Sequence, residues 1–480
     1  MRKDLENNIL ELLPFTPTEE QSYLIKKVSR FCLKENSLDI FVLNGYAGTG
    51  KTSLLGALSK SFLNFRQKFV LLAPTGRAAK VLQSKTKCFT STIHKHIYQS
   101  KVDSGGFTSF HRKPNKTKNT IYIVDESSMI HSKKIDSEGI KGTSVLDDLI
   151  GFVFSGEGNK LILVGDTAQL PPVNLERSIA LDPEELQHAF WKNVDHFTLS
   201  DVKRQKENSD ILWSATSVRE TINGEEDTQV PQLKDNSAEC IRHQDRYELE
   251  YALDNAMDVN GTDETVVICR SNKRANQYNQ RIRQHFYGRE SEIERGDHIM
   301  IVKNNYFWVN QDSDAGFLAN GEMAHVERIV RFVSEYGYRF VELELKLVDY
   351  PNMKPFVAMA YVDTLYNDSA SLSFQETQKL YYQLLEEYSE IPTKRKRFER
   401  IKQNPYFNAL QIKFAYALTC HKSQGGQWDE VFIEQPYWDL KNMNNSDYKW
   451  LYTAITRASK KVHLIGFDPK FFIENETKHS

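Results

Sequence analysis

The sequence predicts an α/β protein with two domains, each built on a parallel sheet with flanking helices. Between Asp39 and about Ser200, short β-rich runs alternate with helical stretches. The strand candidates in this part are Ile40–Asn44, Phe69–Ala73, Ile121–Val124 and Lys160–Val164. A polar or glycine turn follows each of them, which is typical of parallel strands joined by crossover helices. The pattern resumes after residue 201, with a buried strand at Thr265–Cys269, and returns from Gln411 to a final strand at Val462–Ile465.

Two insertions interrupt these domains. Residues 96–119 contain a β-hairpin pattern with Gly105-Gly106 at its turn. Residues 316–365 alternate β-branched and aromatic positions, which predicts a small β-barrel, and a helix with a capping box of Ser373 and Glu376 follows. The domain division is therefore 1–95 and 120–200 for the first sheet, 96–119 for the hairpin, 201–315 and 411–480 for the second sheet, and 316–410 for the barrel with its helical insertion.

The composition predicts a soluble, globular protein of several domains. The chain has 480 residues, of which 40% are hydrophobic and 26% charged, and its apolar runs are much shorter than a membrane span. The N-terminus leads into no long apolar stretch, so we expect neither a membrane segment nor a secretory signal. The five cysteines are odd in number and lack the paired spacing of metal sites. We therefore expect a reduced cytoplasmic protein without structural zinc.

The net charge of −2 is weak evidence against a nucleic-acid-binding protein. It does not exclude one, because a basic groove can lie on a neutral molecule. Two basic clusters are present, at Arg112–Lys118 and at Lys394–Arg400. Solvated loops explain such clusters as well as phosphate contacts do, so both interpretations stay open.

A phosphate-binding loop is predicted at Gly45–Thr52, which matches the pattern G-x-x-x-x-G-K-[ST] between a predicted strand and a predicted helix. Such a loop wraps backbone N–H groups around phosphates at a helix N-terminus. Lys51 would reach the β- and γ-phosphates of ATP, and the Thr52 hydroxyl would hold Mg²⁺. The residues expected to bind ATP here are Gly45, Ala47, Gly48, Thr49, Gly50, Lys51, Thr52 and Ser53.

Two further strands end in side chains suited to ATP hydrolysis. After Ile121–Val124, Asp125 would anchor Mg²⁺ through water, and Glu126 would orient and deprotonate the attacking water. After Lys160–Val164, Gln169 is placed to sense the γ-phosphate, although a capped loop with prolines would also explain this segment. All these side chains fall at the carboxyl ends of parallel strands, where such sheets bind their ligands.

Three side chains elsewhere are candidates for the same ATP site. The Gln21 amide can read the adenine edge, but Thr18-x-x-Gln21 is also a helix capping box, and the residues alone leave both open. Arg204 and Arg457 are candidate arginine fingers, which typically raise turnover ~10³–10⁵-fold by neutralising charge on the transferred phosphoryl group. A single Arg is far more often a surface charge, so these two assignments depend on the neighbouring motifs.

In their order along the chain, these motifs resemble those of superfamily 1 helicases, in particular the RecD-like and Dda-like type B branch. Ala73–Lys80 and Ser91–His94 mark the RecD-like branch, and the long insertion with a helix is more similar to the Dda arrangement. The other matching segments are Thr18–Gln21, Gly45–Thr52, Asp125–Met129, Gly165–Pro172, Arg204, His421–Gly425 and Thr453–Arg457. The resemblance spans nearly the whole chain.

This resemblance implies two RecA-like domains with Mg-ATP between them, movement from 5′ to 3′ on single-stranded DNA, and a hairpin that acts as a strand-separating pin. It makes Gln21 an adenine reader, and it makes Arg204 and Arg457 contacts of the γ-phosphate. Hydroxyls, histidine and lysine suit phosphate contacts, and an aromatic ring can stack on any base. The DNA-binding residues that it implies are Pro74, Thr75, Thr92, His94, Phe107, Phe110, His421 and Lys422.

The expected function is that of a monomeric, ATP-dependent DNA helicase acting on single-stranded DNA and at single-strand/duplex junctions, with single-strand-binding, recombination or replication proteins as candidate partners. Three alternatives stay open: a RecD-like motor subunit of a nuclease complex, an ATP-gated single-stranded-DNA-binding module without unwinding, and an RNA helicase. No nuclease motif is visible, and Glu126 and both arginines needed for turnover are present. No residue pattern reads a 2′-hydroxyl, so the sequence does not separate DNA from RNA.

Overall fold

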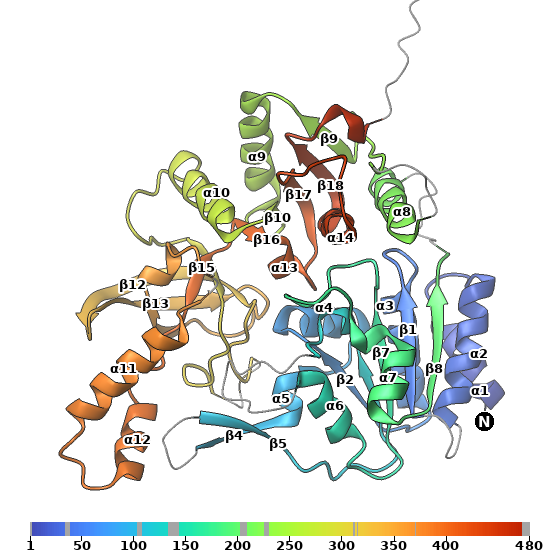
Figure 1. Cartoon of the computed structure of the whole chain (residues 1–480), viewed down its shortest axis with the longest axis horizontal. Helices are drawn as coiled ribbons and strands as arrows, with labels where there is room; N and C mark the ends of the chain where they lie inside the picture. The colour runs from blue at the N-terminus through green and yellow to red at the C-terminus, as the bar shows by residue number, and fades with distance from the viewer. Residues whose placement is uncertain are drawn as a thin grey trace, which may run out of the picture.

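The computed structural model describes residues 2–33, 39–102, 108–132, 144–201, 209–224, 230–310, 313, 315–369 and 371–472. These residues form two parallel sheets, one antiparallel sheet and a separate two-stranded hairpin. Figure 1 shows the N-terminal parallel sheet below the C-terminal one, with the antiparallel sheet beside them. Within the described ranges, no helix is long and apolar enough to cross a membrane.

The first parallel sheet has the strand order β3-β2-β6-β7-β1-β8. Its strands are β1 (Ile40–Gly45), β2 (Phe69–Ala73), β3 (Thr90–Thr92), β6 (Ile121–Val124), β7 (Lys160–Gly165) and β8 (Val194–Leu199). The helical segments around it are α1 (Arg2–Leu12), α2 (Glu19–Leu33), α3 (Lys51–Asn64), α4 (Gly76–Thr86), α5 (Ile93–Ile97), α6 (Val145–Val153), α7 (Pro183–Phe190) and the 3-10 turns η1 (Ser127–Met129) and η2 (Ile179–Leu181). The four predicted strands are confirmed, with β1 and β7 each one residue longer.

The residues of β1 show why these strands are easy to find in the sequence. Phe41 and Leu43 pack in a core with α1, α2 and α3. Ile40 and Val42 pack in a second core, with α5 and α6, on the other face of the sheet. A strand covered on both faces is apolar throughout and therefore forms a continuous hydrophobic run.

The second parallel sheet has the strand order β16-β10-β17-β18-β9. Its strands are β9 (Cys240–His243), β10 (Thr265–Cys269), β16 (Ala417–Thr419), β17 (Trp428–Glu434) and β18 (Ala458–Ile465). Its helical segments are α8 (Asp210–Asn223), α9 (Arg246–Asn260), α10 (Asn272–His285), α13 (Cys420–Ser423), α14 (Asn445–Ile455) and the 3-10 turn η4 (Pro469–Phe471). The predicted strand Thr265–Cys269 is confirmed. Strand β18 begins at Ala458, before the predicted Val462; the prediction missed its first residues because most of them are polar.

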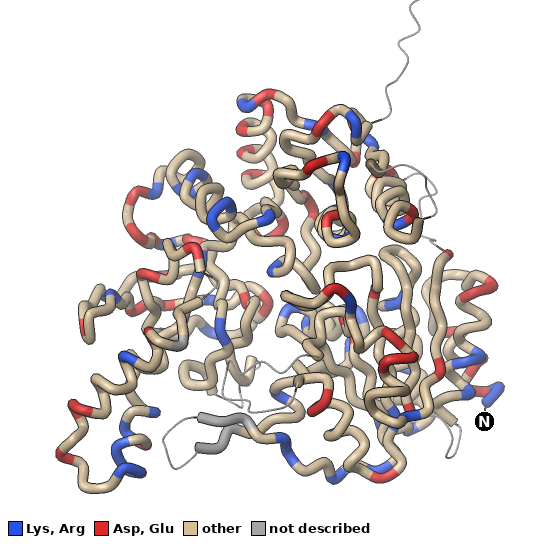
Figure 2. The backbone as a smooth tube through the Cα atoms, in the orientation of Figure 1, with Lys and Arg blue, Asp and Glu red and all other residues tan. Residues whose placement is uncertain are grey.

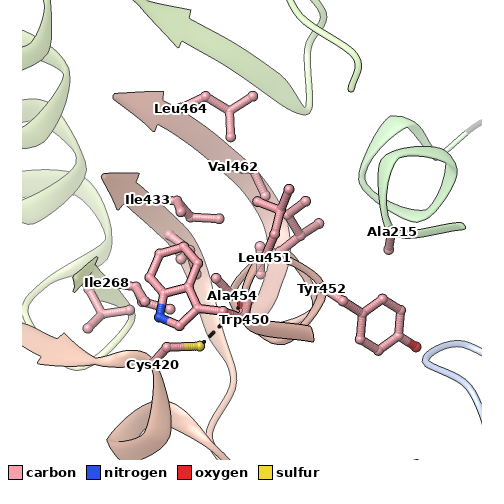
Figure 3. Close-up of a cluster of buried hydrophobic side chains, with 14 of the residues drawn as sticks. Ala215, Ile268, Cys420, Ile433, Trp450, Leu451, Tyr452, Ala454, Val462 and Leu464 are labelled. Carbon is pink, nitrogen blue, oxygen red and sulfur yellow. Dashed lines mark hydrogen bonds between the residues drawn. The ribbon is translucent and has the colours of Figure 1, made fainter. Parts of the chain in front are cut away.

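Helix α14 fills the core of this second domain. Figure 3 shows Trp450 and Leu451 of α14 packed among Ile433, Val462 and Leu464 of the sheet. The thiol of Cys420 on α13 donates a hydrogen bond to the Trp450 carbonyl oxygen at 3.4 Å. These contacts fix α13 and α14, which carry the two C-terminal motifs, against the same sheet.

The antiparallel sheet has the strand order β14-β13-β12-β11-β15. Its strands are β11 (His298–Ile301), β12 (Met323–Glu335), β13 (Tyr338–Leu347), β14 (Phe356–Tyr361) and β15 (Ile412–Phe414), and the 3-10 turn η3 (Asp363–Leu365) follows β14. Leu410, just before β15, pairs with Ala360 on β14. Since β14 and β15 are the two edges of the sheet, this pairing joins the edges and closes the sheet on itself. Since β11 and β15 lie outside residues 316–410, the sheet takes strands from both sides of that range.

Two helices, α11 (Phe374–Glu387) and α12 (Lys394–Lys402), pack on this sheet. The predicted capping box of Ser373 and Glu376 at the start of α11 is confirmed. Figure 2 shows the basic residues of α12 along the edge of the molecule, and Phe398 and Ile401 anchor the helix by their burial. Part of this basic cluster is therefore the exposed face of a helix, not a loop.

The predicted hairpin is observed as strands β4 (Tyr98–Val102) and β5 (Thr108–Arg112), which pair in antiparallel register. It follows α5 directly and stands apart from the first parallel sheet. The predicted turn at Gly105-Gly106 lies outside the described residues, as does Phe107.

Candidate active site and nucleic-acid interface

The segment between β1 and α3 is a tight turn that depends on two glycines. Gly48 and Gly50 have φ values of 84° and 86°, a region that residues with a side chain rarely adopt. A Cβ on Gly50 would also come within 3.0 Å of Gln21 Nε2. The turn therefore holds the backbone of residues 45–50 in front of the N-terminus of α3, where N–H groups attract phosphate.

The first turn of α3 carries the predicted phosphate and magnesium ligands Lys51, Thr52 and Ser53. Lys51 Nζ donates hydrogen bonds to the carbonyl oxygens of Tyr46, at 2.9 Å, and of Gly45. The lysine side chain is thus folded back over the loop, and its positive charge lies against the loop backbone that is expected to bind phosphate.

The structure places both halves of the Gln21 capping box in contact. Gln21 N donates to Thr18 Oγ1 at 3.1 Å, and Thr18 N donates to Gln21 Oε1 at 3.0 Å. The other end of the amide, Nε2, donates to the carbonyl oxygen of Thr49 in the phosphate loop at 2.9 Å. Gln21 therefore completes the cap at the start of α2 and also connects that helix to the phosphate loop. To contact adenine, its amide would have to give up these hydrogen-bond partners.

Asp125 and Glu126 follow β6 directly. Glu126 has a φ of 52°, which is uncommon for a residue with a side chain, and its N–H donates to Asp125 Oδ1 at 2.9 Å. Burial and the adjacent charge of Glu126 raise the pKa of Asp125 well above its usual value, while the charge of Lys51 opposes this shift. A buried carboxylate beside a second one fits a divalent cation, which Asp125 and the Thr52 hydroxyl could hold.

Tyr452 of α14 joins the phosphate loop to the second domain. Its hydroxyl accepts a hydrogen bond from Ala47 N at 2.8 Å and donates one to Asp166 Oδ2 at 2.8 Å. Asp166 is fully buried, and its other oxygen accepts from Ala168 N. Figure 3 shows the Tyr452 side chain pointing away from the core cluster toward a blue, N-terminal segment. One hydroxyl group thus contacts two motifs of the first domain.

The loop after β7 docks directly on the second domain. Leu170 N donates to Thr453 Oγ1 of α14 at 2.9 Å, and Gln424 Nε2 donates to the Leu170 carbonyl oxygen at 2.7 Å. The side chains of Ala168 and Leu170 belong to the hydrophobic core of the second domain. The predicted segments Gly165–Pro172, His421–Gly425 and Thr453–Arg457 therefore meet at the interface between the two domains.

Gln169 lies in the same loop, beside a hollow of about 190 Å³ that Asp166 and Lys449 also line. Its Oε1 is buried without a hydrogen-bond partner among the described residues. Because buried polar atoms are nearly always paired, the amide of Gln169 is available for a ligand at this interface.

The two predicted arginine fingers have different outcomes. Arg204 lies outside the described residues. Arg457 is buried, and it donates from Nε to the Thr453 carbonyl oxygen at 3.0 Å and from a terminal nitrogen to that of Gly426 at 3.2 Å. Both partners belong to the second domain, so this guanidinium ties α14 to the segment after α13. A phosphate contact by Arg457 requires it to leave these carbonyl oxygens.

Sequence reasoning missed Arg219, which reaches the phosphate loop from α8. Its side chain is 12% exposed, and its guanidinium lies 4.6 Å from the centre of the Tyr46 ring. Two of its nitrogens have no hydrogen-bond partner in the described part of the chain. The available signal is its position one helical turn after the buried Ala215, because an arginine on the apolar face of a helix is unusual.

A groove of about 370 Å³ opens where the two domains and the antiparallel sheet meet. Every predicted DNA-binding residue outside the hairpin lines it: Pro74, Thr75, Thr92, His94, His421 and Lys422. Phe110 lies in β5, and its side chain is not among those described. The groove also includes residues that the motifs did not predict, among them Met129, His131, Val173, Asn304, Phe317 and Asn320.

The threonines of the groove also have a local structural role. Thr75 Oγ1 accepts from Ala78 N at 3.2 Å and begins α4, and Thr92 Oγ1 accepts from Lys95 N at 3.2 Å and begins α5. Each hydroxyl therefore caps a helix. The N-terminal end of α4 faces the groove as a result, which favours a negatively charged ligand there.

The basic side chains of the groove are partly removed from water. Burial lowers the pKa of Lys422 to about 8, and no acidic group contributes to that shift among the described residues. Burial, together with the nearby His131, lowers the pKa of His94 to about 4. A desolvated lysine without a carboxylate partner is a favourable place for a phosphate to bind.

Two family models match the chain. An AAA domain model matches residues 19–243, which include the phosphate loop and the first parallel sheet. A UvrD-like helicase C-terminal domain model matches residues 414–465, which include α13 and α14.

Among curated proteins, an uncharacterised protein of Acanthamoeba polyphaga mimivirus is 23% identical, over 92% of this chain and 98% of its own length. An uncharacterised protein of Methanocaldococcus jannaschii is 24% identical over 88% of this chain, which spans 36% of that protein. The ATP-dependent RecD2 DNA helicase of Deinococcus radiodurans is 29% identical over 36% of this chain and 23% of its own length.

Among solved structures, a Pif1 helicase chain from a study of DNA unwinding at forked double-stranded DNA by two coordinating Pif1 helicases has 16% identity and a TM-score of 0.49. The match covers 96% of this chain and 94% of that chain. A Bacteroides Pif1 helicase in complex with ADP-AlF3 and single-stranded DNA has 15% identity and a TM-score of 0.48, covering 96% and 95%. The motifs, the two parallel sheets, the two family models and the RecD2 relative agree with one another, and together they support a superfamily 1 type B helicase of the RecD-like type.

Proposed function

We propose that this helicase hydrolyses Mg-ATP between its two RecA-like domains, moves from 5′ to 3′ on single-stranded DNA and unwinds the duplex ahead of it. The observation that supports this most strongly is the path of contacts between the phosphate loop and the groove. Tyr452 contacts Ala47 and Asp166 at one end of the path. At the other end, Gln424 lines the groove and holds the Leu170 carbonyl oxygen. A change at the phosphate loop can therefore reach the groove through a few hydrogen bonds.

In this proposal the phosphates of ATP lie against the backbone of Gly45–Thr52 and against Lys51 Nζ. Thr52 and Asp125 would hold Mg²⁺, which would supply positive charge to offset the phosphate charge. Glu126 accepts the proton of the attacking water. The Gln21 amide reads the adenine edge. The side chains that would contact the γ-phosphate are Gln169, Arg204, Arg219 and Arg457.

Competition for a single N–H group explains how nucleotide binding would move the second domain. Ala47 N–H is a phosphate-loop donor, yet it donates to the Tyr452 hydroxyl. A phosphate oxygen that takes this hydrogen bond displaces Tyr452 and with it α14. Because the residues of α13 in the groove belong to the same domain, the grip on DNA changes when ATP binds and again when the products leave.

The hairpin is the proposed strand-separating pin. It continues directly from α5, whose His94 lines the groove, so its strands begin at the edge of the proposed DNA path. An aromatic side chain near its end, Phe107 or Phe110, would stack on a base at the junction.

Lys422 gives a direct test of DNA binding in the groove. The Lys422→Met variant is expected to bind single-stranded DNA about 10- to 100-fold more weakly, because a charge-assisted phosphate contact is lost from a desolvated position. Lys441→Met, which changes an exposed lysine of the same domain, serves as the control. Fluorescence anisotropy with a labelled oligonucleotide measures both, together with DNA-stimulated ATP hydrolysis. Equal affinity in the two variants would show that DNA does not use this groove.

The same lysine predicts a pH dependence of DNA affinity. With a pKa of about 8, Lys422 is charged below that pH and loses its proton above it. A bound phosphate raises this pKa, so affinity should be constant below about pH 8 and fall by up to about tenfold per pH unit above it. Lys413, whose pKa burial also lowers to about 8, is expected to add a smaller slope because it does not line the groove. Affinity measured from about pH 7 to about pH 9 should lose most of its slope in Lys422→Met.

A further inference from the structure

A cluster of two histidines and one aspartate lies where the second parallel sheet meets the antiparallel sheet. Asp263 is in the turn between α9 and β10, His298 begins β11, and His325 is paired with His298 across the strands β11 and β12. Oδ1 of Asp263 is 2.8 Å from Nε2 of His325 and 3.6 Å from Nε2 of His298. One ligand-type atom from each residue lies within 4.8 Å of those of the other two.

His298 supplies a second, independent observation. Its side chain is completely buried, and neither ring nitrogen has a hydrogen-bond partner among the described residues. Such unpaired buried atoms call for a ligand, because buried polar groups are nearly always satisfied. The backbone of Thr262 approaches the ring and suits the outer partner that a metal-bound histidine usually has for its second nitrogen.

Another histidine pair in this chain shows what a satisfied cluster looks like. His463 uses both ring nitrogens: Nδ1 is 2.8 Å from His243 Nε2, and Nε2 is 3.0 Å from Glu430 Oε2. That cluster is closed by its own hydrogen bonds and has no open ligand atom on His463. The cluster around His298 likewise has two histidines and one carboxylate, but neither ring nitrogen of His298 makes a hydrogen bond within the described residues, and Nε2 lies 3.6 Å from Asp263 Oδ1.

We propose that Asp263, His298 and His325 bind one divalent transition-metal ion, with Zn²⁺ as the best match to two imidazoles and one carboxylate. Ligand atoms on a tetrahedral zinc, at ~2.0–2.1 Å from the metal, are about 3.3 Å apart. The distances of 2.8 and 3.6 Å lie on either side of that value. Asp263 and His325 are 40% and 29% exposed, so water can reach the site and complete the coordination.

The role of this metal would be to fasten the antiparallel sheet to the second RecA-like domain. Two ligands come from β11 and β12, and the third comes from the turn before β10, an inner strand between β16 and β17. The positive charge of Arg77 lies near both Asp263 and His298 and would repel a bound cation. The negative charges of Asp349 and Glu264 interact with Arg77 and offset part of this repulsion. Arg77 itself stacks on Trp428 at 4.0 Å, so the site adjoins the contact with the first domain.

Metal analysis of the untagged, full-length chain tests this proposal. The protein is stripped with a chelator, mixed with Zn²⁺ in the presence of excess Mg²⁺, and separated from free metal. We expect one equivalent of bound zinc, an increase in Tm, and the intense visible absorption of tetrahedral Co²⁺ when cobalt replaces zinc. Asp263→Asn and His325→Gln should each weaken binding by more than the ~10–100-fold that loss of an outer partner costs.

His285→Gln is the matched control, because His285 is an exposed histidine that contacts a carboxylate, Glu250, in the same domain. It should bind zinc as the unchanged chain does. Zinc binding that is absent from the unchanged chain, or that is equal in all three variants, would overturn the proposal. If a variant folds poorly, the stoichiometry and the cobalt spectrum of the unchanged chain decide the question by themselves.

Discussion

Glu126→Gln should bind ATP with nearly unchanged affinity and hydrolyse it about 10²–10⁴-fold more slowly, as expected when a general base is lost. The amide has the shape of the carboxylate but cannot accept a proton from water. Glu126 also adopts the left-handed backbone region, at a φ of 52°, next to the Mg²⁺ candidate Asp125. Such an uncommon backbone conformation, at the end of a central strand, is typical of residues in active sites.

The measurement combines nucleotide binding with steady-state and single-turnover ATP hydrolysis, both with and without single-stranded DNA. Glu11→Gln, an exposed position on α1, controls for the loss of one negative charge in the same domain. Turnover near the wild-type rate in Glu126→Gln would reject the assignment of this residue as the base. Lost ATP binding would instead indicate a structural role at the phosphate loop.

Lys51→Ala should abolish ATP hydrolysis and weaken ATP binding together. The ammonium group is the phosphate-loop cation, and it also holds the loop through the carbonyl oxygens of Gly45 and Tyr46. Its removal therefore takes away the charge that meets the phosphates and two hydrogen bonds that shape the loop. Both effects act before the chemical step, unlike the effect of Glu126→Gln.

Lys60→Ala is the control for this change, because Lys60 is an exposed lysine on the same helix, α3. Binding of a fluorescent ATP analogue and release of phosphate are measured for both variants, with Tm as the check on folding. Substantial hydrolysis by a well-folded Lys51→Ala protein would contradict the ATP site described above.

Most of the parallel-sheet architecture could be predicted from the sequence. β2, β6 and β10 have the predicted bounds, because strands buried on both faces appear as unbroken apolar runs. Six of the groove residues could also be named in advance, because the resemblance to helicases points to them. Their convergence depends on the rule that parallel strands present their carboxyl ends at one edge of the sheet.

The antiparallel sheet was harder to delimit. β11 and β15 are four- and three-residue strands on either side of a long segment, and only pairing across that segment makes them part of the sheet. Short apolar runs of this kind carry no signal of their partner. Sequence distance hides the proposed metal ligands in the same way, because residues 263, 298 and 325 have no regular spacing.

The individual contacts between the domains could not be predicted. Tyr452 lies one residue before a recognised motif, but its hydrogen bonds to Ala47 and Asp166 depend on how two separate domains meet. Arg219 lies in a helix with no motif. For Gln21 the sequence posed a choice between cap and ligand contact, whereas the amide in the structure forms the cap and also holds the phosphate loop.

The measurement that tests the central claim most directly is strand separation, with ATP and Mg²⁺, on two DNA duplexes that differ only in whether the single-stranded tail is 5′ or 3′. The proposed motor should open the 5′-tailed duplex and leave the 3′-tailed one closed, and Glu126→Gln should open neither. Opening only from the 3′ tail would contradict the direction. If neither duplex opens while DNA still stimulates ATP hydrolysis, the account of unwinding is contradicted and a motor subunit or an ATP-gated DNA-binding module takes its place.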